Sequence, residues 1–117
     1  MQLSIMRSAS AESPDSVEFR LIGSIDLSTR QMLLDATAEA LETAKTLMID
    51  AGGVDFVDSV GLGALITVSQ RAEQAGARFV ITRQSATLQR VVTFAGLDAN
   101  WHGAPHRGAG VVDGVTS

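Results

Sequence analysis

The chain has 117 residues, of which 45% are hydrophobic and only 4% aromatic, so it can bury one core built mostly from aliphatic side chains. Its formal net charge of -4 at pH 7 disfavours nucleic acid and anionic membrane surfaces as partners. Because the chain has no cysteine, a disulfide framework, a thiolate nucleophile and a zinc-thiolate site are excluded.

Membrane insertion is not expected from this sequence. No apolar run approaches the length of about 18 residues that a spanning helix needs, and the N-terminus does not have the pattern of a secretory leader. We therefore expect a cytoplasmic protein.

The first two elements are predicted to be strands at residues 2–7 and 17–22, where apolar and polar side chains alternate. Residues 8–16 are rich in Ser and Ala and contain Pro14-Asp15, which is typical of a turn. The two strands are expected to form an antiparallel hairpin at the edge of a sheet.

A first helix is predicted from Ser28 to about Ala44. Ser28 and Gln31 have the spacing of a capping box, in which each side chain satisfies the other end of the first helical turn. The expected buried stripe recurs at intervals of three and four residues and comprises Leu33, Leu34, Thr37, Ala38 and Leu41.

The residues 46–50 are almost continuously apolar, which predicts a central strand covered on both faces and broken by the following Ala51-Gly52-Gly53. A second helix is predicted over 59–75, with Gly76 as its left-handed C-terminal residue. Its buried stripe is expected to be Leu62, Leu65, Ile66, Ser69 and Ala72.

A third strand-helix pair is predicted at residues 77–82 and from Ser85 to Gly96, with Ser85 as the helix cap. Its expected buried residues are Leu88, Val91, Val92 and Ala95. The alternation predicts a single-domain α/β fold: a mixed, mostly parallel sheet of four to five strands, packed with three to four helices through right-handed crossovers.

The domain is expected to comprise residues 1–102, followed by a Gly-rich, mobile tail at 103–117. Trp101 is expected either to cover one end of the core or to contact a partner. His102 and His106 stand in a segment without helix formers, so we expect them to be solvated rather than a metal or acid-base pair.

The sequence is organised around residues 54–63, where an apolar run ends at Asp58 and a helix follows. If Asp58 is the N-cap, Ser59 lies in the first turn, where free N–H groups and the helix dipole would tolerate a phosphate. Asp26 would oppose that charge if its loop meets this one, and the apolar rim of Val60, Leu62 and Gly63 would become anionic. The simpler interpretation is that Asp58 only caps the helix.

Gly61 and Gly63 each cost about 1 kcal/mol relative to alanine inside a helix, which indicates that a strand or another protein approaches the backbone there. An enzyme is not predicted, because residues 57–61 lack the first glycine of a Gly-x-Ser-x-Gly nucleophile elbow. Neither glycine-rich segment has the pattern of a phosphate-binding loop, so no cofactor is expected.

Three segments together resemble the STAS domains of bacterial anti-sigma factor antagonists: residues 23–26, 57–63 and 94–97, within a likeness that covers about residues 1–100. The resemblance implies a phosphorylatable binding protein with no catalytic activity. Its unmodified form binds an anti-sigma factor that is also a serine kinase, which frees the sigma factor. Phosphorylation releases the kinase and a PP2C-type phosphatase resets the protein, so that transcription is regulated, as in stress responses, by partner switching.

By this resemblance, Ser59 matches the phosphoacceptor, Asp58 its preceding acidic residue, and Asp26 the aspartate of a Gly-Glu-Leu-Asp segment. The implied partner-binding surface comprises Asp26, Asp58, Ser59, Val60, Gly61, Leu62 and Gly63. Two departures bear on kinase recognition: Val60 replaces a second Ser or Thr, and Ser24 replaces the Glu.

STAS-like domains also serve as regulatory subunits of membrane transporters and as scaffold components of stress-signalling assemblies. The short chain favours the sigma-regulatory role over these alternatives.

Overall fold

The computed structural model describes residues 2–9 and 14–96. In chain order the elements are β1 (Leu3–Ala9), β2 (Ser16–Ile25), α1 (Arg30–Leu41), β3 (Thr46–Val57), α2 (Ser59–Gln74), β4 (Arg78–Gln84) and α3 (Ala86–Phe94). One four-stranded mixed sheet and three helices make up the described part of the chain, so the predicted α/β class is confirmed. Trp101, His102, His106 and the predicted tail at 103–117 lie outside the described residues.

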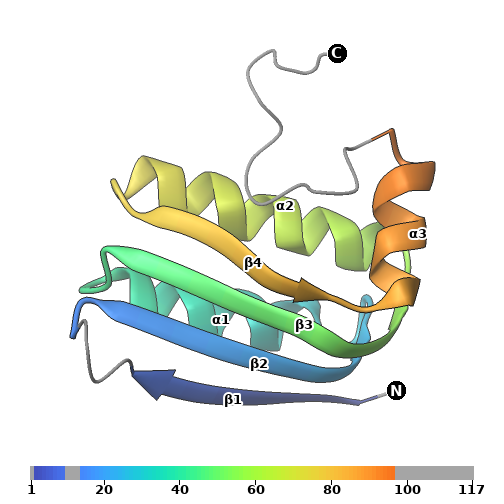
Figure 1. The fold of residues 1–117 in the computed structure, drawn as a ribbon, viewed down its shortest axis with the longest axis horizontal. Helices are drawn as coiled ribbons and strands as arrows, with labels where there is room; N and C mark the ends of the chain where they lie inside the picture. Colours follow the sequence, from blue (N-terminus) through green and yellow to red (C-terminus); the bar gives the residue numbers. More distant parts are fainter. Residues whose placement is uncertain (1, 10–13, 97–117) are drawn as a thin grey trace.

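The strands follow the order β1-β2-β3-β4, so every strand lies beside its neighbour in sequence (Figure 1). β1 and β2 pair antiparallel, which confirms the predicted hairpin, and β2, β3 and β4 are parallel. The crossovers through α1 and α2 step across the sheet in the same direction. Right-handed connections therefore place both helices on one face, where they pack against each other (Figure 1).

The core lies between the sheet and its helices. Its largest fully buried side chains are almost all aliphatic, and Phe19 is the one aromatic among those that the structure describes. The prediction that residues 46–50 are covered on both faces is wrong. Leu47 and Ile49 face the helices and are fully buried, whereas Met48 points to the opposite face and remains half-buried.

The predicted break of this strand at residues 51–53 is also wrong, since β3 continues through the glycines to Val57. Two register shifts against β2 show bulges in β3, one at residues 51–52 and one at Asp55. The Asp50 carboxylate accepts the Gly52 N–H at 3.0 Å, and a Cβ on Gly53 would lie 2.9 Å from Cγ1 of Ile22. With these bulges, β3 continues to the end of the sheet where the candidate site lies.

The predicted capping box is wrong. α1 begins two residues later than expected, and Thr29 occupies its N-cap position without a side-chain cap bond. The Ser28 hydroxyl donates instead to Asp26 at 2.7 Å, and the Gln31 amide donates to Asp35 at 2.8 Å. In a capping box the Ser28 N–H would donate to the Gln31 side chain, but here the Asp26 carboxylate accepts this N–H at 2.9 Å.

The first helix also ends earlier than predicted, at Leu41 rather than near Ala44. The termini of the other two helices agree with the prediction. α2 begins at Ser59, and its end is followed by Gly76 in the left-handed region at φ +77°. Ser85 caps α3 by accepting the Leu88 N–H at 3.1 Å, and Gly96 follows the helix at φ +86°. None of the helices within residues 14–96 combines the length and apolar composition needed to cross a membrane.

The helical periodicity identified most of the core-facing positions. Those that are buried are Leu33, Leu34, Thr37, Leu62, Leu65, Ser69, Ala72, Leu88 and Val92, and Leu41, Ile66 and Val91 are partly buried. Two predicted positions are wrong, because Ala38 and Ala95 are exposed. Ala40 takes the buried place on α1, and Ala95 is the C-cap of α3 rather than part of its inner face.

Candidate binding and modification site

The loops after β2 and β3 meet at one end of the sheet. Ile25 and Val57 are paired neighbours in the parallel ladder, so Asp26 and Asp58, which follow them, leave the sheet side by side. The loop that contains Asp26 therefore meets the loop before α2, as the sequence analysis required for Asp26 to lie near the start of this helix. This end of the sheet brings together the three segments 23–26, 55–58 and 59–63.

The two glycines of α2 have different surroundings. Gly61 is buried against the end of β2, and a Cβ at this position would overlap the backbone carbonyl of Ile25. Gly63 is exposed, and no neighbouring atom lies within 4 Å of the position that its Cβ would occupy. The close approach expected from these glycines is thus made by a strand at Gly61, while Gly63 contributes a bare patch of helix surface.

Asp58 caps α2, as expected. Its backbone is extended, and its carboxylate accepts the Gly61 N–H at 2.8 Å. The first intrahelical hydrogen bond joins the Leu62 N–H to the Asp58 carbonyl at 2.9 Å. The N–H groups of Ser59 and Val60 therefore have no partner within the helix, and they are directed toward its N-terminal end.

Ser59 is the first residue of α2 and is exposed. Among the described residues its hydroxyl makes no hydrogen bond, in contrast to that of Ser85, which occupies the cap of α3. The Ser59 hydroxyl is thus sterically accessible to a modifying enzyme, and it lies beside the unpaired amides of the first helical turn.

The Asp26 carboxylate is turned into its own loop, and the residue is only 8% exposed. It accepts hydrogen bonds from the Ser28 hydroxyl at 2.7 Å, from the Ser28 N–H at 2.9 Å and from the Thr29 N–H at 3.2 Å. The Ser28 hydroxyl is the main cause that lowers the pKa of Asp26 below its ordinary value, and it outweighs the opposing effect of burial. Asp26 therefore shapes the loop more than it presents a charge.

Thr29 completes this loop, although the sequence analysis did not identify it as a site residue. Its buried hydroxyl accepts the Asp26 N–H at 3.0 Å and donates to the Ser24 carbonyl at 2.9 Å. The Asp-x-Ser-Thr spacing is typical of side chains that bond to nearby backbone, and this signal could have identified the turn.

Exposed apolar side chains lie on the segments that meet at this end of the sheet. Leu27 is 74% exposed at the tip of the β2–α1 loop, Phe56 is 38% exposed near the end of β3, and Val60 is 37% exposed. Leu27 and Phe56 were missed from the sequence, because nothing in the pattern distinguishes them from core residues. Leu62 is only 6% exposed, so its side chain belongs to the core and offers little surface to a partner.

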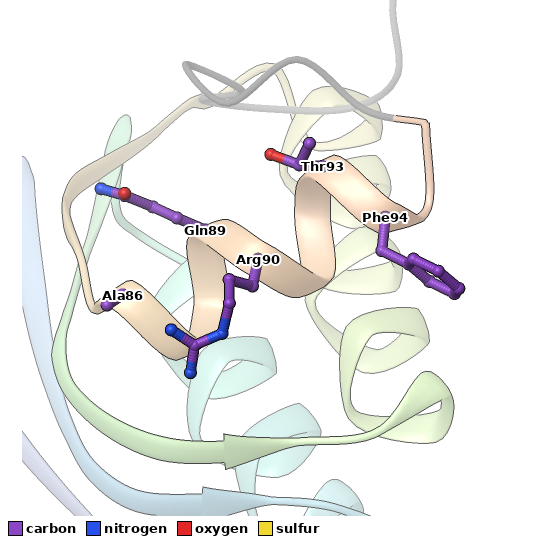
Figure 2. A pocket seen from close by; sticks show the side chains of 5 residues that line it. All are labelled: Ala86, Gln89, Arg90, Thr93 and Phe94. Carbon is purple, nitrogen blue, oxygen red and sulfur yellow. The ribbon is translucent and has the colours of Figure 1, made fainter.

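A separate shallow depression lies on the outer face of α3 (Figure 2). It is lined by Ala86, Gln89, Arg90, Thr93 and Phe94, and the Phe94 side chain projects away from the helix. None of the predicted site residues lines it. Of the segment at residues 94–97 that supported the family resemblance, Leu97 lies outside the described residues.

The fold and this loop arrangement can be compared with known proteins. Residues 8–104 match the family described as MlaB, STAS domain. The chain belongs to the STAS domain family. The STAS domain is also 27% identical over 107 residues to the anti-sigma F factor antagonist of Lysinibacillus sphaericus. This alignment covers 86% of this chain and 92% of that protein.

Solved structures establish the STAS fold of the chain. An anti-sigma factor antagonist from Mycobacterium paratuberculosis aligns with a TM-score of 0.72 and 19% identity over 94% of this chain and 92% of that one. The anti-sigma factor antagonist SpoIIAA in its unphosphorylated form aligns with a TM-score of 0.66 and 21% identity over 97% and 96%. Phosphorylated SpoIIAA of Bacillus aligns at 0.65 and 21% over 80% and 85%.

Proposed function

We propose that this STAS domain is an anti-sigma factor antagonist whose unmodified form binds an anti-sigma factor serine kinase and whose phosphorylation at Ser59 ends that binding. The observation that carries the proposal is the exposed Ser59 residue at the start of α2, directly after the capping Asp58, on segments that also expose the apolar side chains of Leu27, Phe56 and Val60. The relatives named for anti-sigma factor antagonism, one of them also solved in a phosphorylated form, support it.

A phosphate on Ser59 is compatible with the local structure. The unpaired N–H groups of Ser59 and Val60 and the positive end of the helix dipole favour an anion at this position. The Asp58 carboxylate accepts the Gly61 N–H, whereas the phosphate would use the N–H groups of Ser59 and Val60. The cap hydrogen bond can therefore remain when Ser59 is phosphorylated.

The same phosphate is incompatible with an apolar interface. It adds a charge of about -1.5 to -2 directly after the carboxylate-bearing Asp58. Burying an unpaired charge costs about 3 to 5 kcal/mol, which corresponds to a loss in affinity of more than about a hundredfold. Modification would therefore release a partner that covers Leu27, Phe56 and Val60, and a PP2C-type phosphatase would restore binding.

In this role the protein would work in the cytoplasm and regulate transcription through release of a sigma factor, without touching DNA itself. The net charge of -4 supports a protein partner over nucleic acid. The proposed domain comprises residues 1–102, and the family match over 8–104 supports that extent.

Incubation with the cognate kinase and ATP, followed by phosphopeptide mass spectrometry, tests the proposal. Ser59→Ala is expected to bind the kinase but to remain unmodified, whereas Ser59→Glu is expected to bind more weakly. Ser28 and Ser85 serve as internal controls, because the hydroxyl of each is engaged in a loop or cap hydrogen bond. Label on either of them, with Ser59 unmodified, would contradict the assignment.

Val60 favours a second candidate function, in which the same surface binds its partner constitutively. The residue replaces a hydroxyl with an apolar side chain that is 37% exposed. A regulatory subunit of a membrane transporter or a scaffold of a stress-signalling assembly would use such a surface. Co-purification separates the candidates, since recovery of a transporter ATPase instead of a kinase supports the second.

A further inference from the structure

Among the strands that the structure describes, β1 is the outermost on one side of the sheet, and its outer edge is open (Figure 1). We propose that it pairs with β1 of a second copy of the chain, so that a two-fold symmetric dimer carries one continuous sheet. This interaction surface is separate from the Ser59 site, and the proposal does not depend on the proposed function.

The hydrogen-bonding pattern identifies which backbone groups remain available. The Ser24 N–H donates to the Gln2 carbonyl at 2.9 Å, and these two residues lie directly opposite each other in the register of the hairpin. Antiparallel pairs alternate between bonded and non-bonded, so the even-numbered residues of β1 bond to β2. The groups that point to the open edge belong to Leu3, Ile5, Arg7 and Ala9.

This edge lacks the features that usually prevent edge-to-edge pairing. β1 keeps an unbroken seven-residue register with β2, and it contains no proline and one charged residue, Arg7. The Arg7 guanidinium lies 5.9 Å from the centre of the Phe19 ring and 3.6 Å from the Glu39 carboxylate of α1. Its charge is thus directed over the helix-bearing face and partly neutralised, so it does not prevent another strand from pairing with this edge.

The strand is complementary to itself about Met6. With the two-fold axis at this residue, Ile5 lies opposite Arg7 of the second copy and Leu3 lies opposite Ala9, so all the outward-pointing groups find partners. Met6 then faces Met6 of the second copy in a close, non-hydrogen-bonded pair. Its side chain is 51% exposed on the helix-free face, where the contact would bury it.

The proposed dimer leaves both candidate sites free. The carboxyl ends of β2 and β3 lie at one end of each sheet, and the two-fold axis turns the second sheet end for end. The two Ser59 residues therefore point in opposite directions along the continuous sheet, and each can meet its own partner.

Sedimentation velocity over about 1 μM to about 1 mM tests the association. The wild-type chain is expected to shift from the monomer mass of 12.3 kDa to twice that mass as concentration rises. Met6→Lys is expected to remain monomeric throughout. The matched control is Ile22→Lys, because Ile22 is 43% exposed on the same face but one strand further in, and it should still dimerise. A wild-type chain that stays monomeric overturns the proposal.

Cysteine crosslinking tests the register, since the chain contains no cysteine of its own. The close pair at Met6 has a Cα separation of about 4.5 Å, within the range that a disulfide spans. Met6→Cys is expected to give a reducible covalent dimer under mild oxidation. Ser4→Cys, exposed on the same face but opposite Ser8 of the second copy, is expected to stay uncrosslinked. Equal crosslinking of both variants, or none at Met6→Cys, contradicts the pairing.

Discussion

Gly61 packs its α-carbon against the carbonyl group of Ile25, and the contact leaves no space for a side chain at this position. This contact joins the end of β2 to the start of the helix that carries Ser59. The position of the Ser59 hydroxyl relative to the Asp26 loop is therefore set by backbone packing, not by side-chain interactions that could vary.

Gly61→Ala is expected to lower the free energy of unfolding by about 2 kcal/mol or more, because the new methyl group must displace the Ile25 backbone. The matched control is Gly63→Ala, which meets open space and should raise helix propensity by up to about 1 kcal/mol. Urea unfolding of both variants measures the difference. Equal stabilities would show that the packing at Gly61 is not as tight as described.

Asp58→Ala is expected to destabilise the fold by about 1 kcal/mol, because the Gly61 N–H loses its acceptor. Asp58→Asn keeps an oxygen at the same position and should cost only a few tenths of a kcal/mol. Chemical denaturation of the two variants checks this ranking. A large loss in both would mean that the negative charge, and not the cap bond, stabilises α2.

Acid pH should act on the Asp26 loop. The pKa of this carboxyl is lowered from 3.8, chiefly by the Ser28 hydroxyl, so its stabilising contribution is present above about pH 4 and is lost as pH falls through the lowered value. Ser28→Ala should raise the pKa of Asp26, and Ser28→Thr should preserve it. NMR titration of the carboxyl group tests this, and an unchanged titration in Ser28→Ala would assign the shift to the backbone donors.

Leu27 is the most exposed of the apolar side chains around Ser59, at 74%. If the proposed partner covers this surface, Leu27→Ala should weaken binding about tenfold or more, as truncation of a central interface residue does. The unfolding free energy should change little, because the side chain makes few contacts in the free protein. Met32→Ala is the control, since Met32 is 44% exposed on α1. Isothermal titration calorimetry measures the affinity of each variant for the partner. Equal affinities of Leu27→Ala and Met32→Ala would show that the partner binds at another surface.

The order and type of the elements could be predicted because they depend on local periodicity and caps. Alternation identified β1 and β2, helical stripes identified the inner faces, and the sites of Asp58, Ser85 and Gly76 follow from short-range backbone chemistry. The meeting of Asp26 and Asp58 followed from the parallel pairing of the strands before them.

The predictions that failed depended on which of several available hydrogen-bond partners a residue takes. Gly52 and Gly53 usually end a strand, but here β2 supplies a partner ladder that accepts them as bulges. Ser28 has the pattern of a cap, but the Asp26 carboxylate accepts the Ser28 N–H that a capping box would direct to Gln31. The exposure of Leu27 arises because its neighbours on both sides bond inward, which the residue's own chemistry cannot indicate.

The strand order β1-β2-β3-β4 also bears on how the chain folds during synthesis. Because each strand is added next to the one before it, the sheet can grow in the direction of translation without closing a long loop between its ends. β2, β3 and α2 are complete by residue 74, before β4 and α3 emerge. The surface around Ser59 can thus assemble while the ribosome still holds the last third of the protein.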